Sequence, residues 1–209
     1  YGVEVKDVIT RVETMALDGT TRTFNNEECE YGYRDSIFKR DLRGQYIVTH
    51  VTYRLEKSPT YRLDYGDLRT RVEAQGEPTL KSVRNAVTAI RESKLPDPRV
   101  LGNAGSFFTN PVIPRTQYET LKAQYPTMPS YPLDEEHIKV PAGGLIDSAG
   151  WKGRALGRAA VHDRQALVLV NLGGATGKEV MTLAERICQE VMEKYGIRIT
   201  PEVNYISCD

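Results

Sequence analysis

The residues whose chemistry stands out first lie in one stretch, KLPDPRVLGNAGSFFTNP at positions 94–111. It gathers the ammonium of Lys94, the hydroxyl of Ser106 and the amide of Asn110 around two glycines. Glycines let a backbone turn tightly and approach a ligand, and loops between regular elements often carry binding and catalytic groups. The stretch therefore predicts an active-site loop that carries Ser106, although its local sequence is equally compatible with a tight turn.

Two other positions add charged groups that an anionic ligand could use. Arg34 follows Tyr33 and precedes Asp35, so its guanidinium either grips a carboxylate or phosphate or forms a surface ion pair with Asp35. Glu202, taken alone, is a solvated carboxylate near the end of the chain. Combined with the hydroxyl, lysines and amides, these groups predict a site that binds an anionic substrate and reduces or hydrolyses it.

Neither glycine-rich segment matches a nucleotide-binding motif. In GGATGK at 173–178, the first glycine of a phosphate loop falls on Leu172, and Glu179 replaces the serine or threonine that binds magnesium. Gly102 and Gly105 lack the GxGxxG spacing of a dinucleotide fingerprint. The first segment therefore predicts a turn and a helix cap rather than a phosphate site.

The composition limits the class of partner. The 28 basic and 28 acidic side chains give a net charge of zero, which weighs against nucleic acid and against insertion at an anionic membrane. The sequence shows no apolar run near membrane-spanning length and no signal-peptide pattern. Scattered cysteines (Cys29, Cys188 and Cys208) and histidines predict neither a disulfide framework nor a metal site. These features predict a soluble chain in the reducing cytoplasm.

The elements that must position these groups differ between the two halves of the chain. The first half predicts a hairpin at 7–24, a strand at 45–55, an irregular loop at 56–78 and a helix at 79–93. The expected N-cap of that helix is Thr79, and Pro96 stops it.

The second half alternates strand and helix. Helices are predicted at 116–125, 141–149 and 176–195, and strands within 131–140 and at 166–170, 197–199 and 203–206. Capping boxes that begin at Thr116 and Thr176 predict two helix starts, and Gly150 is the expected C-terminal glycine of the short helix. The pattern predicts an α+β fold with a domain boundary near 93–99.

Four motifs in order along the chain closely resemble the UDP-N-acetylenolpyruvoylglucosamine reductase (MurB, UDP-N-acetylmuramate dehydrogenase) family of peptidoglycan synthesis. They are CEYGYRDSIFK at 29–39, KLPDP at 94–98, GNAGSFF at 102–108 and QALVLVN at 165–171, and the likeness ends at Pro201-Glu202-Val203. The resemblance implies a cytoplasmic flavoenzyme of cell wall biogenesis, and hence of cell shape and cell division. In that family NADPH reduces FAD, and the flavin then reduces UDP-N-acetylglucosamine enolpyruvate to UDP-N-acetylmuramate.

The resemblance also implies roles for single residues. Ser106 resembles the general acid that protonates the substrate carbon left carbanionic after hydride transfer. Arg34 and Glu202 resemble the pair that stabilises the enolic intermediate, the guanidinium by its charge and the glutamate by a hydrogen bond from its protonated form. Tyr33 and Arg34 are the expected FAD contacts. The positions expected to hold the UDP moiety are Tyr65, Lys94, Asn110, Tyr131, Lys152 and Gln165.

The resemblance implies an α+β substrate-binding domain at 96–209, whose last strand returns toward the active site, preceded at 1–95 by the remaining part of an α+β FAD-binding domain. Tyr65 lies in the tyrosine loop of the family class that closes such a loop over its substrate. The likeness begins inside the family's sequence at Tyr1-Gly2, so the resemblance implies a chain that lacks the family's first FAD domain. We therefore expect the chain alone to be a monomer that binds FAD weakly or not at all and is inactive, and stoichiometric flavin absorbance of the purified chain would contradict this.

Two other readings compete with a reductase. The chain could be a catalytically inactive UDP-sugar-binding module, which would bind the UDP-sugar without NADPH turnover. It could also be an unrelated α+β interaction domain, which would require the four motifs to coincide by chance.

Overall fold

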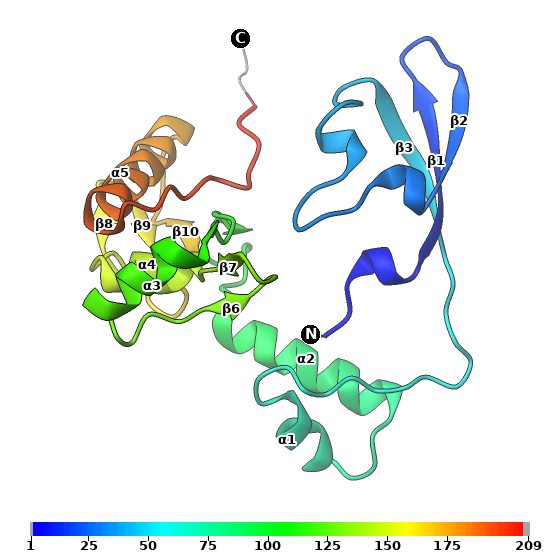
Figure 1. Ribbon diagram of the computed structural model, residues 1–209, viewed down its shortest axis with the longest axis horizontal. Helices are drawn as coiled ribbons and strands as arrows, with labels where there is room; N and C mark the ends of the chain where they lie inside the picture. The colour runs from blue at the N-terminus through cyan, green and yellow to red at the C-terminus, as the bar shows by residue number, and fades with distance from the viewer. Residues whose placement is uncertain (1, 207–209) are drawn as a thin grey trace. The chain divides into compact units, whose positions relative to one another are not determined.

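The computed structural model describes residues 2–206, and the chain separates into two compact units, Tyr1–Thr88 and Ala89–Asp209. Both units contain helices and strands, which confirms the predicted α+β class (Figure 1). The division falls inside helix α2 (Leu80–Lys94). The roles predicted for 1–95 and 96–209 stay predictions.

The first unit is built on an antiparallel sheet in the order β2-β1-β3. Its strands are β1 (Ile9–Ala16), β2 (Thr21–Asn25) and β3 (Tyr46–Tyr53), so the predicted hairpin and the following strand are confirmed. Buried Phe24 contacts the rings of Phe38 and Tyr46 edge-on, at centroid distances of 5.1 and 5.5 Å. The described part of this unit also contains three short 3-10 helices, η1 (Val5–Asp7), η2 (Glu27–Cys29) and η3 (Ile37–Lys39).

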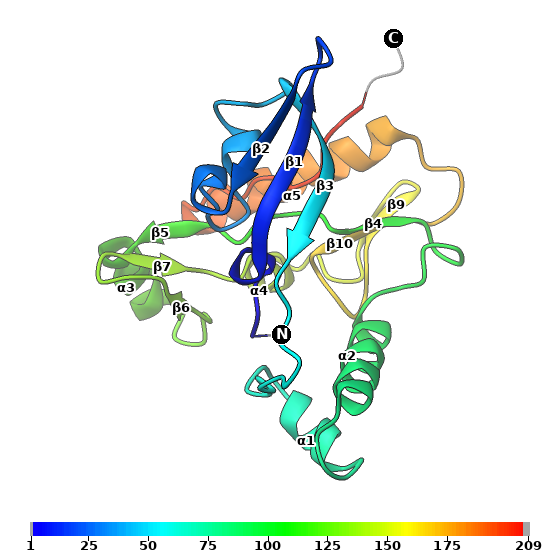
Figure 2. The ribbon, with the colours of Figure 1, turned by 90° about the vertical axis from the view of Figure 1, so that its right-hand side faces the viewer.

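Strand β3 lies at an edge of this sheet (Figure 2). Its eight residues include Ile47 and Val48, which are 58% and 45% exposed. The other edge is the shorter strand β2. The longer edge of the sheet is therefore also the more apolar one.

The prediction of an irregular loop at 56–78 is wrong in part, because helix α1 (Leu68–Glu73) lies within it. Leu68 and Val72 are 1% and 0% exposed, so one side of this short helix is held by burial. Asp67 occupies the N-cap position, but its carboxylate accepts a hydrogen bond from Arg71 at 2.5 Å and makes no cap bond. Asp67 is thus a favoured N-cap residue by type, but its side chain pairs with Arg71 in place of capping the helix.

Helix α2 follows the prediction closely. The hydroxyl oxygen of Thr79 accepts a hydrogen bond from the backbone N–H of Ser82 at 3.0 Å, which confirms Thr79 as the N-cap. Ala86 and Ile90, one turn apart, are 3% and 2% exposed. The helix ends at Lys94, just before Pro96.

In residues 89–206 the second unit contains the end of α2, two antiparallel sheets and three further helices. One sheet has the order β4-β10-β9-β8, so β10, the strand predicted at 166–170, has a neighbour on each side. Its strands are β4 (Asn103–Ser106), β8 (Ala155–Leu156), β9 (Ala159–Val161) and β10 (Val168–Asn171). The other sheet has the order β5-β7-β6, with β5 (Val112–Pro114), β6 (Tyr131–Pro132) and β7 (His137–Lys139). The helices are α3 (Arg115–Gln124), α4 (Ala142–Ser148) and α5 (Gly177–Tyr195).

The core of the second unit lies against the long helix α5. Leu183, Ile187 and Val191, spaced by four residues, are each 0% exposed and belong to one cluster with Trp151 and Ile146. This spacing places all three on one side of the helix, which is the helix predicted at 176–195. The largest apolar side chains of the second half thus form a single cluster.

Two predictions about the second unit are wrong. Thr116 does not cap α3, because Pro114 occupies the N-cap position and no side-chain cap bond forms. The segments 197–199 and 203–206 are not strands. Ile197 and Ile199 are 1% and 2% exposed, so they alternate toward the core as strand residues do, but their backbone does not join a sheet.

The predicted cap of α5 is present and carries a strong charge interaction. Thr176 and Glu179 form a capping box, and Gly196 ends the helix at φ +62°. The Arg158 guanidinium donates to both carboxylate oxygens of Glu179 at 3.1 and 3.0 Å. This contact and the hydrogen bonds from Thr176 lower the pKa of Glu179 from 4.5 to about 2.

The lowered pKa predicts how Glu179 links stability to pH. A carboxyl whose folded pKa is depressed contributes fully above its unfolded pKa, near 4.5, and loses that contribution as pH falls toward about 2. We expect Glu179→Gln to lower the thermal midpoint at pH 7 and the difference from wild type to shrink between pH 4.5 and 2. Calorimetry at several pH values measures this. Glu185→Gln, a change elsewhere on α5, is the control, and a difference that stays constant with pH would contradict the expectation.

The remaining sequence expectations concern cysteines and membrane spans. Cys29 and Cys188 are free thiols, while Cys208 lies outside the described residues. Within residues 2–206, none of the helices combines the length and apolar character needed to cross a membrane.

Candidate functional site

Ser106 is the last residue of β4, and its neighbours are fixed by burial and by β10. Ser106 is exposed, whereas Phe107 and Phe108, which follow it, are 3% and 2% exposed. The backbone N–H of Phe107 donates to the carbonyl of Leu167 at 2.7 Å. Among residues 2–206 the Ser106 hydroxyl has no hydrogen-bond partner, so it is accessible to a ligand.

The tail that follows α5 brings Glu202 next to Phe107, the residue after Ser106. The backbone N–H of Glu202 donates to the carbonyl of Phe107 at 2.8 Å, and Pro201 forms a β-bridge with Phe108. The N–H of Thr109 donates to the carbonyl of Thr200 at 3.0 Å. A carboxylate and a hydroxyl from distant parts of the sequence therefore lie on adjoining backbone segments.

Asn110 and Gln165 both lie near the start of α4. The side-chain oxygen of Asn110 accepts from the N–H of Ala142 at 2.9 Å, and that of Gln165 accepts from the N–H of Leu167 at 3.3 Å. A Cβ on Gly143 would lie 3.4 Å from the Gln165 side-chain oxygen. Both amide oxygens are thus used within the protein, and the amide NH2 groups are the parts that can donate to a ligand.

Three other predicted site residues belong to this unit. Within residues 2–206, none of them forms a hydrogen bond or ion pair with Ser106. Lys94 is the exposed end of α2, and Tyr131, 59% exposed, lies on β6. The ammonium of Lys152 forms an ion pair with Asp147 at 3.1 Å. A phosphate bound by Lys152 would have to compete with that carboxylate.

Arg34 occupies a strained turn of the first unit. Its φ of +56° is uncommon for a residue with a side chain, and such strain collects at functional sites. The turn is closed by the Gly32 N–H, which donates to the Asp35 carbonyl at 3.0 Å. The Arg34 guanidinium carbon lies 5.9 Å from the Tyr33 ring centroid. The Asp35 carboxylate, which the sequence offered as a possible partner of Arg34, forms an ion pair with Arg40.

Tyr65 is displayed by the loop around it. Its side chain is 53% exposed, between Leu63 at 3% and Leu68 at 1%. Gly66 follows with φ +57°, a conformation that favours glycine. The tyrosine is therefore presented from a loop whose two sides are anchored by buried leucines.

The predicted site residues thus fall into two sets. Tyr33, Arg34 and Tyr65 belong to the unit Tyr1–Thr88, and the other seven belong to the unit Ala89–Asp209. The seven are Lys94, Ser106, Asn110, Tyr131, Lys152, Gln165 and Glu202. The sequence analysis missed Asn103, which lies near Ser106, and Gly143, which lies near Gln165. The Asn-x-Gly spacing at 103–105 is typical of a turn held by a side-chain amide, and it was the available signal for Asn103.

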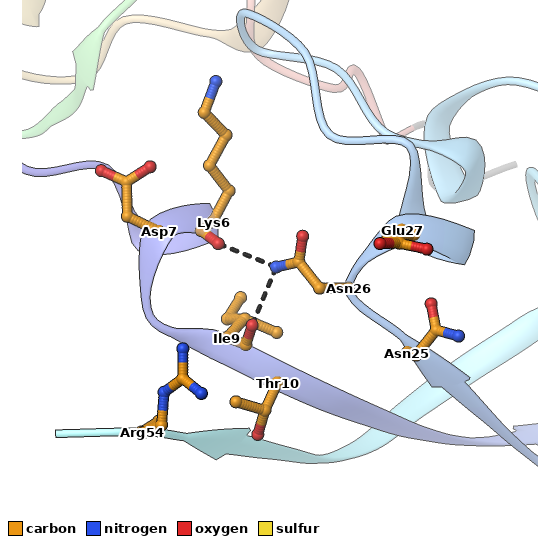
Figure 3. Close-up of a pocket in the computed structure, with 8 residues that line it drawn as sticks. All are labelled: Lys6, Asp7, Ile9, Thr10, Asn25, Asn26, Glu27 and Arg54. Atoms are coloured by element: carbon orange, nitrogen blue, oxygen red, sulfur yellow. Dashed lines mark hydrogen bonds between the residues drawn. The ribbon is translucent and has the colours of Figure 1, made fainter.

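An open cavity of about 490 Å³ in the first unit is separate from these residues (Figure 3). It is formed around Asn26, whose amide nitrogen donates to the carbonyls of Lys6 and Ile9 at 2.8 Å each. The lining residues are Lys6, Asp7, Ile9, Thr10, Asn25, Asn26, Glu27 and Arg54. Its lining carries two positive and two negative side chains, so the cavity favours neither an anionic nor a cationic ligand.

Comparison with known proteins gives one consistent result. A family profile described as the C-terminal domain of UDP-N-acetylenolpyruvoylglucosamine reductase matches residues 97–206. A protein of that name from Bacteroides fragilis is 55% identical over 206 residues, covering 99% of this chain and 62% of the relative. Another, from Flavobacterium johnsoniae, is 46% identical over 210 residues, with the same shares covered. The chain therefore spans about three-fifths of the length of these curated relatives.

A solved structure shares the fold. The crystal structure of UDP-N-acetylenolpyruvylglucosamine reductase from Thermus caldophilus aligns with a TM-score of 0.57 at 24% identity. The alignment covers 95% of this chain and 53% of that one.

Proposed function

The chain belongs to the UDP-N-acetylenolpyruvoylglucosamine reductase family, and from that premise we propose that it takes part in the reduction of UDP-N-acetylglucosamine enolpyruvate to UDP-N-acetylmuramate by NADPH through FAD. The observation that carries the proposal is the hydrogen bond from the Glu202 N–H to the Phe107 carbonyl at 2.8 Å. It joins a carboxyl group to the residue that follows Ser106. A cytoplasmic monomer is part of the proposal.

The proposed chemistry gives Ser106 the proton transfer. Reduction of a carbon–carbon double bond adds a hydride to one carbon and a proton to the next. Ser106, exposed and without a partner among the described residues, donates that proton. A serine hydroxyl is a weak acid, so the site must stabilise its alkoxide or resupply its proton. Glu202, whose backbone adjoins Phe107, stabilises the enolic intermediate by a hydrogen bond.

The residues of the first unit suit an anionic aromatic cofactor. The guanidinium of Arg34 pairs with negative charge and the ring of Tyr33 offers a stacking surface, so this donor set fits FAD. When bound, FAD supplies the hydride that it has taken from NADPH. Arg34 also neutralises the substrate carboxylate in the proposed reaction.

Tyr65 and the amide groups hold the nucleotide part of the substrate in this proposal. The NH2 groups of Asn110 and Gln165 donate to the diphosphate, together with Lys94 and Lys152, while Tyr131 contacts the UDP moiety. The exposed Tyr65, presented from an anchored loop, closes over the substrate and excludes water.

The activity is tested on the enzyme at the full length of its relatives. We expect NADPH oxidation to require UDP-N-acetylglucosamine enolpyruvate and bound FAD, with UDP-N-acetylmuramate as the product. UDP-N-acetylglucosamine, which lacks the enolpyruvyl group, is the control substrate and should support no turnover. NADPH oxidation at the same rate with the control substrate would contradict the proposal.

A second candidate function, UDP-sugar binding without catalysis, is favoured by the division of the site residues. Five of the six residues proposed to hold UDP lie in the unit Ala89–Asp209. Titration calorimetry of the 209-residue chain with UDP-N-acetylglucosamine enolpyruvate distinguishes the two. Binding without flavin and without NADPH turnover, in the full-length enzyme as well, would favour the binding module.

A further inference from the structure

Strand β4 contains an extra residue opposite β10. Ser106 is paired with Val168 and Asn103 with Val170. The two pairs are therefore separated by three residues along β4 but by only two along β10. Gly105, within this interval, has φ +70°. A bulge that contains a left-handed glycine bends its strand and re-aims the side chains that follow. Here the residue that follows is Ser106.

The side chain of Asn103 closes this bulge. Its amide oxygen accepts from the N–H of Gly105 at 3.0 Å. Its amide nitrogen donates to the carbonyls of Leu101 at 2.8 Å and Pro96 at 3.2 Å. All three hydrogen bonds are partly buried, so water competes with them less than on an open surface. The side-chain amide of Asn103 thus connects Pro96, at the start of the 94–111 stretch, to Gly105 in the bulge.

We propose that Asn103 is a positioning residue, which holds the bulge at Gly105 and thereby directs the Ser106 hydroxyl to the reacting carbon. The inference rests on the proposed function, in which Ser106 is the proton donor. A slip of one residue in a strand turns every following side chain to the opposite face. With the bulge in place Ser106 is exposed, while Phe107, the next residue, is 3% exposed and lies in the core. Two interactions therefore fix the same register of β4. The Asn103 amide holds the bulge before Ser106, and burial of Phe107 holds the chain after it.

The kinetic test separates the two half-reactions of the full-length enzyme with Asn103→Ala. Reduction of FAD by NADPH does not use Ser106, so we expect its rate to stay within about twofold of wild type. Reoxidation by saturating UDP-N-acetylglucosamine enolpyruvate should slow by roughly 10- to 100-fold, because small displacements of a reacting group have effects of this size. The solvent deuterium isotope effect on that step should rise, since proton transfer becomes more rate-limiting.

Asn171→Ala is the matched control. Asn171 makes the same kind of clamp on β10: its amide oxygen accepts from the N–H groups of Gly173 and Ala175 at 2.8 and 3.0 Å, but it holds a different turn. We expect this variant to keep both half-reactions within about threefold of wild type. A substrate step that is unchanged in Asn103→Ala, or slowed equally in both variants, or slowed together with FAD reduction, would overturn the inference.

A measurement without flavin tests the clamp itself. The Gly105 N–H is protected by Asn103, so Asn103→Ala should raise its hydrogen-exchange rate about tenfold or more in the 209-residue chain. Unchanged exchange would contradict the role of Asn103. By contrast, a wild-type enzyme that does not oxidise NADPH with the UDP-sugar would overturn the proposed function, and with it the catalytic consequence of the clamp.

Discussion

Replacing Ser106 with alanine is expected to slow the reduction of UDP-N-acetylglucosamine enolpyruvate by about 10²- to 10⁴-fold, the usual contribution of a general acid. Reduction of FAD by NADPH should be nearly unchanged, because only the second half-reaction needs the proton. The exposed hydroxyl has no partner to lose within residues 2–206, so we expect the fold to be kept. Stopped-flow spectroscopy of the full-length enzyme measures the two rates separately.

The control for this change is Thr23→Val, which removes an exposed hydroxyl from strand β2, a strand without predicted site residues. It should leave both half-reactions unchanged. Equal slowing of the two half-reactions in Ser106→Ala would remove Ser106 from the role of proton donor.

The largest effect on stability is expected from Trp151→Ala. The Trp151 side chain is 1% exposed in the main core of the second unit, and its indole N–H donates to Glu190 at 2.8 Å. The Arg154 guanidinium carbon lies 4.3 Å from the centroid of its ring. Truncation to alanine leaves a large cavity, so we expect the free energy of unfolding to fall by about 3–5 kcal/mol. Urea unfolding followed by circular dichroism measures this without the tryptophan signal.

Trp151→Phe separates volume from hydrogen bonding. Phenylalanine keeps most of the ring and loses the bond to Glu190, which still accepts from Arg186 at 2.8 Å. A loss of roughly 1–2 kcal/mol is expected for this variant. If alanine and phenylalanine destabilise equally, cavity formation is not the cause.

Elements whose signals are local were predictable from the sequence. The α5 helix has a capping box at Thr176, an apolar side spaced by about four residues and a glycine at its end, and all three agree. The turn at Asp18-Gly19 between β1 and β2 is local in the same sense.

The errors arose where local signals and tertiary contacts disagree. Thr116 had the spacing of a capping box, but Pro114 already turns the chain into the helix. Ile197 and Ile199 alternate like strand residues because the core buries both, while their backbone has no strand to pair with. Alternation reports burial, and strand formation also needs a partner.

The candidate site was predictable as a set of residues but not as an arrangement. The motif around Ser106 and the glutamate at 202 were both visible in the sequence, yet only the tail that pairs with Phe107 and Thr109 brings them together. Backbone pairing of this kind has no sequence signature, because it depends on where α5 ends in space. The hydrogen bond from the Ala142 N–H to Asn110 was hidden for the same reason.

Strand β3 has a consequence for handling the chain in solution. An edge strand offers unpaired backbone groups to any other strand, and β3 presents apolar Ile47 and Val48 without a proline, lysine or arginine along its length. A net charge of zero adds little long-range repulsion between molecules. Intermolecular β-pairing along the eight residues of this strand is therefore an expected route to aggregation of the 209-residue chain.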